Sequence, residues 1–210
     1  MKNDARMTFD EASHVYRLGD MVLTSVTQIL AEAGLAQFDG PWFSDAVKAR
    51  GTHLHTAIAL DVEGDLDEDT LDEQLLGGVT GWRKFMADTG ARIEFAEFPL
   101  CDPESRTAGR LDYIVVIPDQ KHPGRTLRTV LDVKRALYPS AAIQLAAYAE
   151  MALPLYAQHP LFSRAALVLP GDGSYRLHRF TDPTDRATWH AAVRVVNWRK
   201  EHLKELAHVA

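Results

Sequence analysis

Two acidic residues in strand-like apolar segments are the first candidates for chemistry. Asp112 lies within the apolar run 111–117, and Asp132 begins the sequence Asp132-Val133-Lys134 at the end of another such segment. A carboxylate is costly to bury unless it is paired or binds a cation. Two carboxylates on adjacent strands repel each other unless a cation lies between them. Oxygen ligands of this type suit Mg²⁺ or Mn²⁺.

Lys134 would add a positive charge to this site. Because side chains alternate along a strand, Asp132 and Lys134 share a face, while Val133 points into the core. A lysine beside a metal site can position or deprotonate water and can offset phosphate charge. With a metal, this is the minimum set for hydrolysis of a phosphodiester. The alternative is a structural ion pair without a catalytic role.

Three further side chains accompany this group. Gln144 and Tyr148 are four residues apart in a helical segment and therefore share a face. His55 follows Gly51 by four residues on the first long helix, with His53 nearby. A lone histidine on a helix is more often a surface or packed residue than a ligand, so its role stays open at this point.

Periodicity and turn signals indicate the elements that would position these residues. An apolar period of two predicts strands over residues 92–101, 109–117, 126–135, 164–169 and 174–180. A period of about 3.6 predicts helices from Pro41 to about 62, over 71–88, from 141 to about 154, and over 183–207. A small hairpin over 7–23 and a short helix capped by Ser25 precede them. This order predicts an α/β fold with a mixed sheet.

Composition and charge limit the protein class. The chain has 210 residues, a net charge of −6 and one cysteine, Cys101, which excludes an internal disulfide. Eight acids lie between Asp61 and Glu73, and outside this block the bases exceed the acids by two. The rest of the surface can therefore carry a basic face for nucleic acid. We expect the block to be a solvated loop between helices, and we expect neither a secretory signal nor a membrane span.

Several of these motifs occur in the order in which a nuclease family carries them. The sequences Gly109-Arg110-Leu111-Asp112, Asp132-Val133-Lys134 and Gln144 to Tyr148 resemble the PD-(D/E)-x-K nuclease superfamily, in its RecB-type branch. The sequence Ser25-Val26-Thr27, the pair Gly51 and His55, and Glu97 are similar to the mitochondrial genome maintenance exonuclease family and to phage-type exonucleases. The resemblance covers residues 14–200.

The resemblance implies a restriction-endonuclease-like core, with a mixed central sheet of about four to five strands flanked by helices. It implies one nuclease domain over residues 1–210, with parts at 1–40, 41–90, 91–182 and 183–210. The implied ligands of Mg²⁺ or Mn²⁺ are His55, Asp112, Asp132 and the Val133 carbonyl. Lys134 would be the catalytic lysine, and Glu97 would be a further catalytic or second-metal acid. Gln144 and Tyr148 would orient the lysine or contact DNA, and Ser25, Thr27 and Arg50 would contact phosphates.

The implied activity is that of a metal-dependent DNA exonuclease acting on single-stranded or duplex ends, in phage or prophage recombination or in DNA repair. The implied partners are DNA and a single-strand annealing protein, without a membrane, in the cytoplasm of a bacterial or phage system. Cys101 alone cannot build the four-cysteine iron–sulfur cluster of some relatives, so no such cluster is expected. Two alternatives stay open: a structure-specific endonuclease, and a catalytically silent nucleic-acid-binding module on the same fold.

Overall fold

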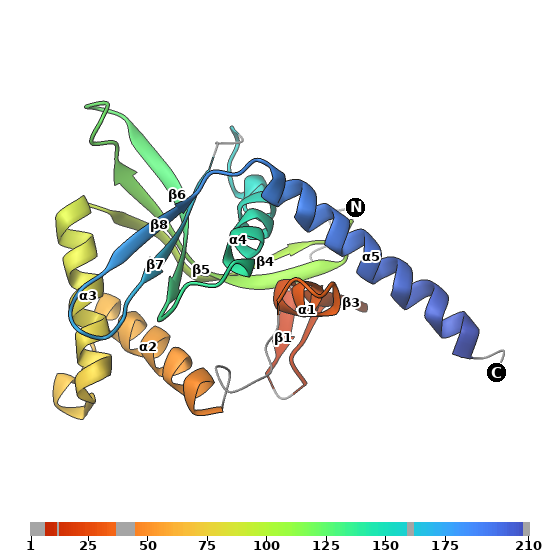
Figure 1. Ribbon diagram of the computed structural model, residues 1–210, viewed down its shortest axis with the longest axis horizontal. Coiled ribbons are helices and arrows are strands. Elements are labelled where there is room, and N and C mark those ends of the chain that lie inside the picture. Colours follow the sequence, from red (N-terminus) through yellow and green to blue (C-terminus); the bar gives the residue numbers. More distant parts are fainter. Residues whose placement is uncertain (1–6, 12, 37–44, 159–161, 208–210) are drawn as a thin grey trace.

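The computed structural model describes residues 7–11, 13–36, 45–158 and 162–207, and it contains a mixed sheet with helices packed on both faces (Figure 1). The strands are β1 (Met7–Asp10), β2 (Val15–Leu18), β3 (Met21–Ser25), β4 (Arg92–Asp102), β5 (Thr107–Pro118), β6 (Thr126–Lys134), β7 (Ser163–Val168) and β8 (Arg176–Phe180). The helices are α1 (Val26–Glu32), α2 (Asp45–Glu63), α3 (Glu73–Thr89), α4 (Ser140–Met151) and α5 (Thr184–Ala207), with short 3-10 turns at Glu68–Thr70 and Leu153–Leu155. The α/β class and the mixed sheet flanked by helices are confirmed.

The number of strands differs from the expectation. Within the described residues the sheet has eight strands, so the expected four to five was too low. The difference comes from the N-terminal segment, where β1, β2 and β3 form an antiparallel meander rather than an isolated hairpin. This meander joins the main sheet because β3 runs parallel to the start of β5, pairing Thr24 with Thr107 and Ser25 with Ala108.

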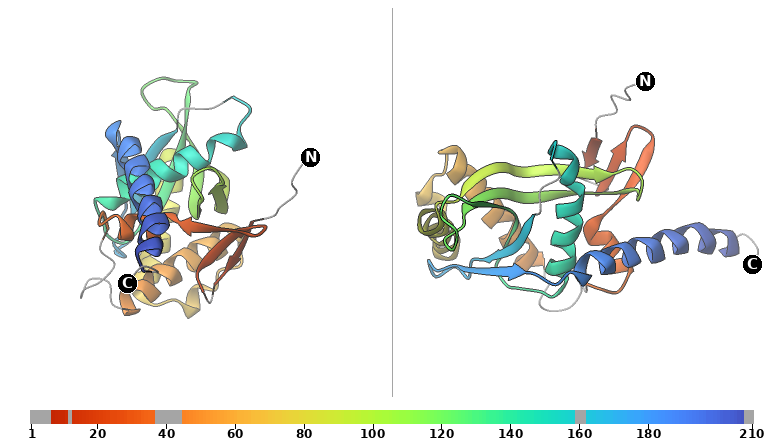
Figure 2. Two further views of the ribbon diagram at one scale, coloured as in Figure 1. Left: turned by 90° about the vertical axis from the view of Figure 1, so that its right-hand side faces the viewer. Right: turned by 90° about the horizontal axis from the view of Figure 1, so that it is seen from above.

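Apolar side chains form a core on each face of the sheet. On one face, α1, α4 and α5 bury Ile29, Leu145 and Trp189 against β5 and β6. On the other face, α2 and α3 bury Ile58 and Trp82 against the same strands. Figure 2 shows β4 and β5 running across the molecule, with α2 and α3 at one end and α5 leading away at the other. The strands of the centre are thus covered on both sides, as strands apolar on both faces require.

Local signals in the sequence set several helix ends. Ser25 Oγ accepts a hydrogen bond from the Gln28 N–H, and Gln28 Oε1 accepts one from the Ser25 N–H, which confirms the expected capping box. Asp182 Oδ1 accepts from the Thr184 N–H at the start of α5. From the sequence, the first long helix, α2, is expected to start at Pro41. This position lies outside the described residues, which resume with α2 at Asp45.

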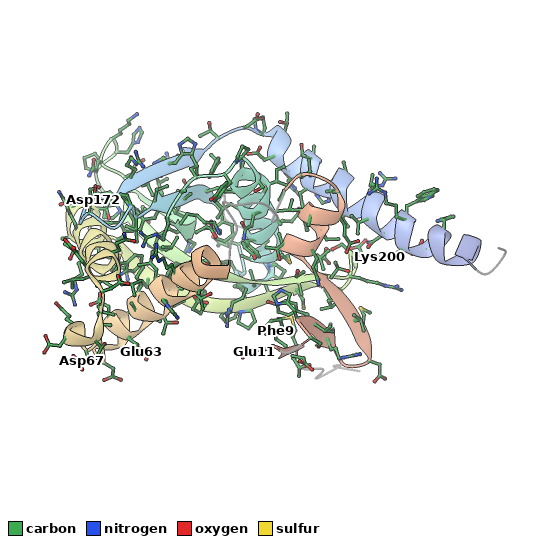
Figure 3. All side chains as sticks on the ribbon, turned by 60° about the horizontal axis from the view of Figure 1, so that its bottom comes forward. Phe9, Glu11, Glu63, Asp67, Asp172 and Lys200 are labelled. Carbon is green, nitrogen blue, oxygen red and sulfur yellow. The ribbon has the colours of Figure 1, made fainter. Side chains whose placement is uncertain are left out.

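The acidic block connects α2 to α3, as expected, and most of its side chains are exposed. Arg83 of α3 pairs with Asp61 and with Glu68, which neutralises part of the block. In Figure 3, Glu63 and Asp67 lie at the end of the molecule opposite Lys200 of α5. Among the described residues, no helix has both the length and the apolar character that crossing a bilayer requires.

An opening in the strand pairing of β5 is the feature of the fold that matters most for the site. One edge of β5 pairs with β4 along most of its length. The opposite edge pairs with β3 at residues 107–108 and with β6 at residues 113–118. Residues 109–112 lie between these two contacts and have no strand partner among the described residues on that edge. Meanwhile β6 continues beside β7 as far as Lys134.

Candidate metal centre

Three side chains from three different elements meet at this opening. His55 of α2, Glu97 of β4 and Asp112 of β5 each offer one ligand atom, and these atoms lie within 4.8 Å of one another. His55 Nδ1 is 3.6 Å from Glu97 Oε1 and 3.7 Å from Asp112 Oδ2. One imidazole nitrogen and two carboxylate oxygens are a donor set that could hold a divalent metal ion.

The Glu97 carboxylate provides a test of whether a cation fits here. Its Oε1 atom is buried and has no hydrogen-bond partner among the described residues. A buried carboxylate oxygen without a hydrogen bond is costly, because it has lost its hydration, and the His55 imidazole at 3.6 Å compensates this only through its charge. A cation between Glu97, His55 and Asp112 would supply the missing interaction, so these residues fit a metal ion.

The backbone of β4 is distorted where it presents Glu97. Glu97 lies opposite Asp112, since its neighbours Ala96 and Phe98 pair with Tyr113 and Leu111. Its φ is +46°, in the left-handed region that residues other than glycine rarely adopt. Such strain persists only when the surrounding structure imposes it, and it is found preferentially at functional sites.

The backbone of Val133 links the other two members of the group. The Val133 N–H donates a hydrogen bond to Asp112 Oδ2 at 2.7 Å, and the Val133 carbonyl lies 3.1 Å from His55 Nε2. A proton on Nε2 donated to this carbonyl leaves Nδ1 free to act as a ligand toward the two carboxylates. The Val133 carbonyl, which the resemblance implies to be a metal ligand, lies within hydrogen-bonding distance of His55 Nε2, where it can orient the imidazole.

The pKa of His55 reflects its acidic surroundings. Burial lowers this pKa, but Asp112, Glu97 and Asp132 together outweigh burial and raise it to about 9. The imidazole is therefore protonated at neutral pH while no metal is bound, and it balances the charge of the carboxylates. A metal ion must displace this proton, because only the unprotonated nitrogen can act as a ligand.

Asp132 and Lys134 form a second group beside the first. Asp132 is 2% exposed, and its Oδ2 lies 3.0 Å from Lys134 Nζ. Burial raises the pKa of Asp132, although Lys134 opposes this effect. Burial lowers the pKa of Lys134, but Asp132 and Asp112 outweigh it, and the net pKa is raised. Asp132 thus contacts Lys134, whereas the acid that joins His55 and Asp112 in the candidate metal group is Glu97.

Helix α4 contributes Gln144 and Tyr148 from the opposite layer. Tyr148 is buried, and burial raises the pKa of its hydroxyl far above the usual value, with a hydrogen bond from Gln144 opposing the shift. The ring packs closely on Gly109 of β5, where a Cβ atom would lie 2.7 Å from Tyr148 Cε1. Glycine at this position therefore allows α4 to approach the unpaired stretch of β5.

For the remaining expected residues, Ser25, Thr27 and Arg50, the described residues show no contact with the group. Ser25 is buried beside the start of β5, and its hydroxyl caps α1 and lies 3.1 Å from Thr27 Oγ1. Arg50 is exposed on α2, the helix that carries His55. His53 is exposed as well, whereas His55 points toward the carboxylates.

One residue in contact with the group had no role in the sequence prediction. Arg110 Nε lies 3.1 Å from Glu97 Oε2, and the side chain is exposed. The signal that could have found it is its spacing of two from Asp112, which puts both side chains on one face of β5.

No protein-family profile matches the sequence, and no curated protein matches it. Within the described residues, the chain carries a candidate metal centre of His55, Glu97 and Asp112 beside the pair formed by the buried Asp132 and the partly exposed Lys134.

Proposed function

We propose that this protein is a metal-dependent DNA exonuclease of the PD-(D/E)-x-K type, which hydrolyses phosphodiester bonds at DNA ends. One observation carries the proposal: the candidate metal group of His55, Glu97 and Asp112 lies beside the Asp132–Lys134 pair, at an unpaired stretch of the central strand. A restriction-endonuclease-like core is part of the same proposal.

In this proposal, His55, Glu97 and Asp112 hold Mg²⁺ or Mn²⁺. The bound ion supplies activation of water and polarisation of a phosphate oxygen. The Val133 backbone keeps the imidazole and the Asp112 carboxylate in place through its two hydrogen bonds. Among the described residues, 109–112 have no strand partner on this edge of β5, and the side chains of Glu97 and Asp112 are 30% and 14% exposed, so a phosphate group would reach them from the solvent side.

Lys134 would act mainly through its charge. Its raised pKa means that the amine is protonated at neutral pH. A fixed cation next to the reacting phosphate stabilises the negative charge that develops in the transition state. Asp132 holds this ammonium group in place with a 3.0 Å contact, and Tyr148 with Gln144 supports the same region from α4.

The choice of DNA ends as substrate rests on the sequence resemblance described above. So do the role in phage or prophage recombination or repair, the annealing-protein partner and the cytoplasmic location. The uneven charge supports a nucleic-acid partner, because the acids concentrate in residues 61–73, in the connection between α2 and α3.

Incubation of the protein with linear DNA and with closed circular DNA, with and without Mg²⁺, tests the proposal. We expect metal-dependent loss of linear DNA and intact circles. The Asp132→Asn variant, purified in the same way, controls for a contaminating nuclease. Cutting of the circles would show an endonuclease, and binding without cleavage of either DNA would show a catalytically silent module. Either result would contradict the exonuclease proposal.

A further inference from the structure

We propose that Arg110 is a phosphate ligand of this site, which holds Glu97 while DNA is absent and moves to a substrate phosphate when DNA binds. This inference rests on the proposed function and extends it. DNA and the metal ion would then strengthen each other's binding, with Arg110 as the residue that links them.

The position of Arg110 is the first argument. Arg110 is two residues before Asp112, so its side chain leaves β5 on the same face as the candidate ligand. Its Nε atom lies 3.1 Å from Glu97 Oε2, on the same carboxylate whose other oxygen faces His55. Both residues 110 and 112 belong to the stretch of β5 that has no strand partner on the site edge among the described residues.

The contrast with Lys134 is the second argument. Two basic side chains form ion pairs with the carboxylates of the site among the described residues. Lys134 pairs with Asp132, and Arg110 pairs with Glu97. Lys134 is 28% exposed and contacts the buried Asp132, whereas Arg110 is 53% exposed and contacts Glu97 from outside. An arriving phosphate therefore meets Arg110 first. The planar guanidinium also presents two parallel N–H groups in a fixed geometry that matches two phosphate oxygens, which an ammonium group does not.

The cost of the exchange is the third argument. An ion pair this exposed contributes little to stability, because water screens it. The positive charge of Arg110 beside Glu97 also disfavours a second cation at the same carboxylate. When a phosphate draws Arg110 away, Glu97 becomes a better metal ligand. Thermodynamic linkage then requires that the metal strengthen DNA binding by the same factor.

The Arg110→Gln variant tests this inference in two measurements that do not depend on catalysis. In calorimetric titration without DNA, Mn²⁺ should bind at least about threefold more tightly than to the parent, since a neighbouring positive charge has been removed. DNA affinity, measured in Ca²⁺, should fall about tenfold, since one charge-assisted phosphate contact is lost. The salt dependence of binding to single-stranded DNA should become shallower by about 0.7 in logarithmic slope. Arg110→Lys should keep the parental Mn²⁺ affinity and show an intermediate DNA affinity.

The Arg125→Gln variant is the matched control. It removes the same charge from an exposed side chain in the loop between β5 and β6, about 20 Å along the strands from Asp112. Its Mn²⁺ affinity should equal that of the parent. Weaker Mn²⁺ binding by Arg110→Gln would mean that Arg110 only positions Glu97, and this would overturn the inference.

The DNA measurements separate this inference from the proposed function. If the parent binds and cleaves DNA while Arg110→Gln binds DNA with parental affinity, the inference is wrong and the proposed function stands. If the parent neither binds nor cleaves DNA, both are wrong.

Discussion

Glu97 and Asp112 lie opposite each other on β4 and β5, and the backbone at Glu97 adopts a positive φ in the left-handed region. The strain brings a partly exposed carboxylate to the imidazole of His55 and to the exposed guanidinium of Arg110. A strand residue with an ordinary negative φ carries no such strain energy. The strained backbone at Glu97 therefore coincides with the position at which its carboxylate meets the site.

Two substitutions of Glu97 separate the strain from the carboxylate. Glu97→Gly and Glu97→Ala both remove the acid, but only glycine adopts a positive φ without a steric penalty. We expect the Gly variant to be about 1 kcal/mol more stable than the Ala variant in chemical denaturation without metal, after allowance for the greater flexibility of unfolded glycine. Equal stabilities would show that the backbone at residue 97 carries no measurable strain.

The two histidines of α2 should differ in metal binding. His55→Ala should weaken Mn²⁺ binding about tenfold or more, since it removes the nitrogen ligand of the candidate group. Mn²⁺ should also bind the parent more tightly than Mg²⁺, because it accepts nitrogen ligands more readily. Calorimetric titration measures both, with His53→Ala as the control of equal composition. If His55→Ala bound Mn²⁺ with the parental affinity, His55 would not be a metal ligand, and the carboxylates alone would bind the ion.

The Asp132–Lys134 pair should be essential for cleavage but not for folding. Asp132→Asn and Lys134→Ala should each abolish cleavage of linear DNA. Lys134→Ala should also lower the free energy of unfolding by about 1–3 kcal/mol, because the buried Asp132 carboxylate loses its partner. Asp132→Asn should be less destabilised, because it removes a charge that burial disfavours. Cleavage rates and denaturation curves of the purified variants decide this, and a near-parental rate in either one would remove that residue from the mechanism.

Two glycines quoted in the same family resemblance should respond in opposite ways. A Cβ at Gly109 would meet the Tyr148 ring at 2.7 Å, so Gly109→Ala should cost about 1–3 kcal/mol of stability. No described atom lies within 4 Å of a Cβ at Gly51 of α2. Gly51→Ala should therefore stabilise the helix by about 0.5–1 kcal/mol. Thermal or chemical denaturation compares the two, and a stable Gly109→Ala variant would contradict the close packing of α4 on β5.

Glu94 should contribute to the pH dependence of stability. Arg128 lowers the pKa of Glu94 below its usual 4.5 through an ion pair with two hydrogen bonds, burial opposes this, and the Tyr156 hydroxyl donates a third hydrogen bond. The folded protein therefore releases the Glu94 proton more readily than the unfolded chain. This contribution is complete above the unfolded pKa and is lost as the pH falls through the folded pKa.

The Glu94→Gln variant measures this contribution. Its free energy of unfolding should fall less than that of the parent between about pH 6 and about pH 3. A parental pH profile in Glu94→Gln would mean that the ion pair with Arg128 does not persist in solution.

The sequence alone predicted the local elements and most of the candidate site residues. The capping pattern of Ser25 and Gln28 located the start of α1, and the change of period after residue 90 separated the helical part from the strands. Asp112 and Lys134 stood out because charged residues are rare in apolar strands. These signals can be read from the sequence because each depends only on residues close to one another in the chain.

The tertiary structure determined which strands pair in the sheet and which side chains meet at the site. The parallel pairing of β3 with β5, which raised the sheet to eight strands, links residues 24–25 to residues 107–108. Periodicity shows which side of a strand faces a core, but it does not show which strand lies beside it. The same limit applies to the site. The choice of His55 over His53 and the contact of Arg110 with Glu97 depend on the packing of α2, β4 and β5, since these residues meet only after distant segments have come together.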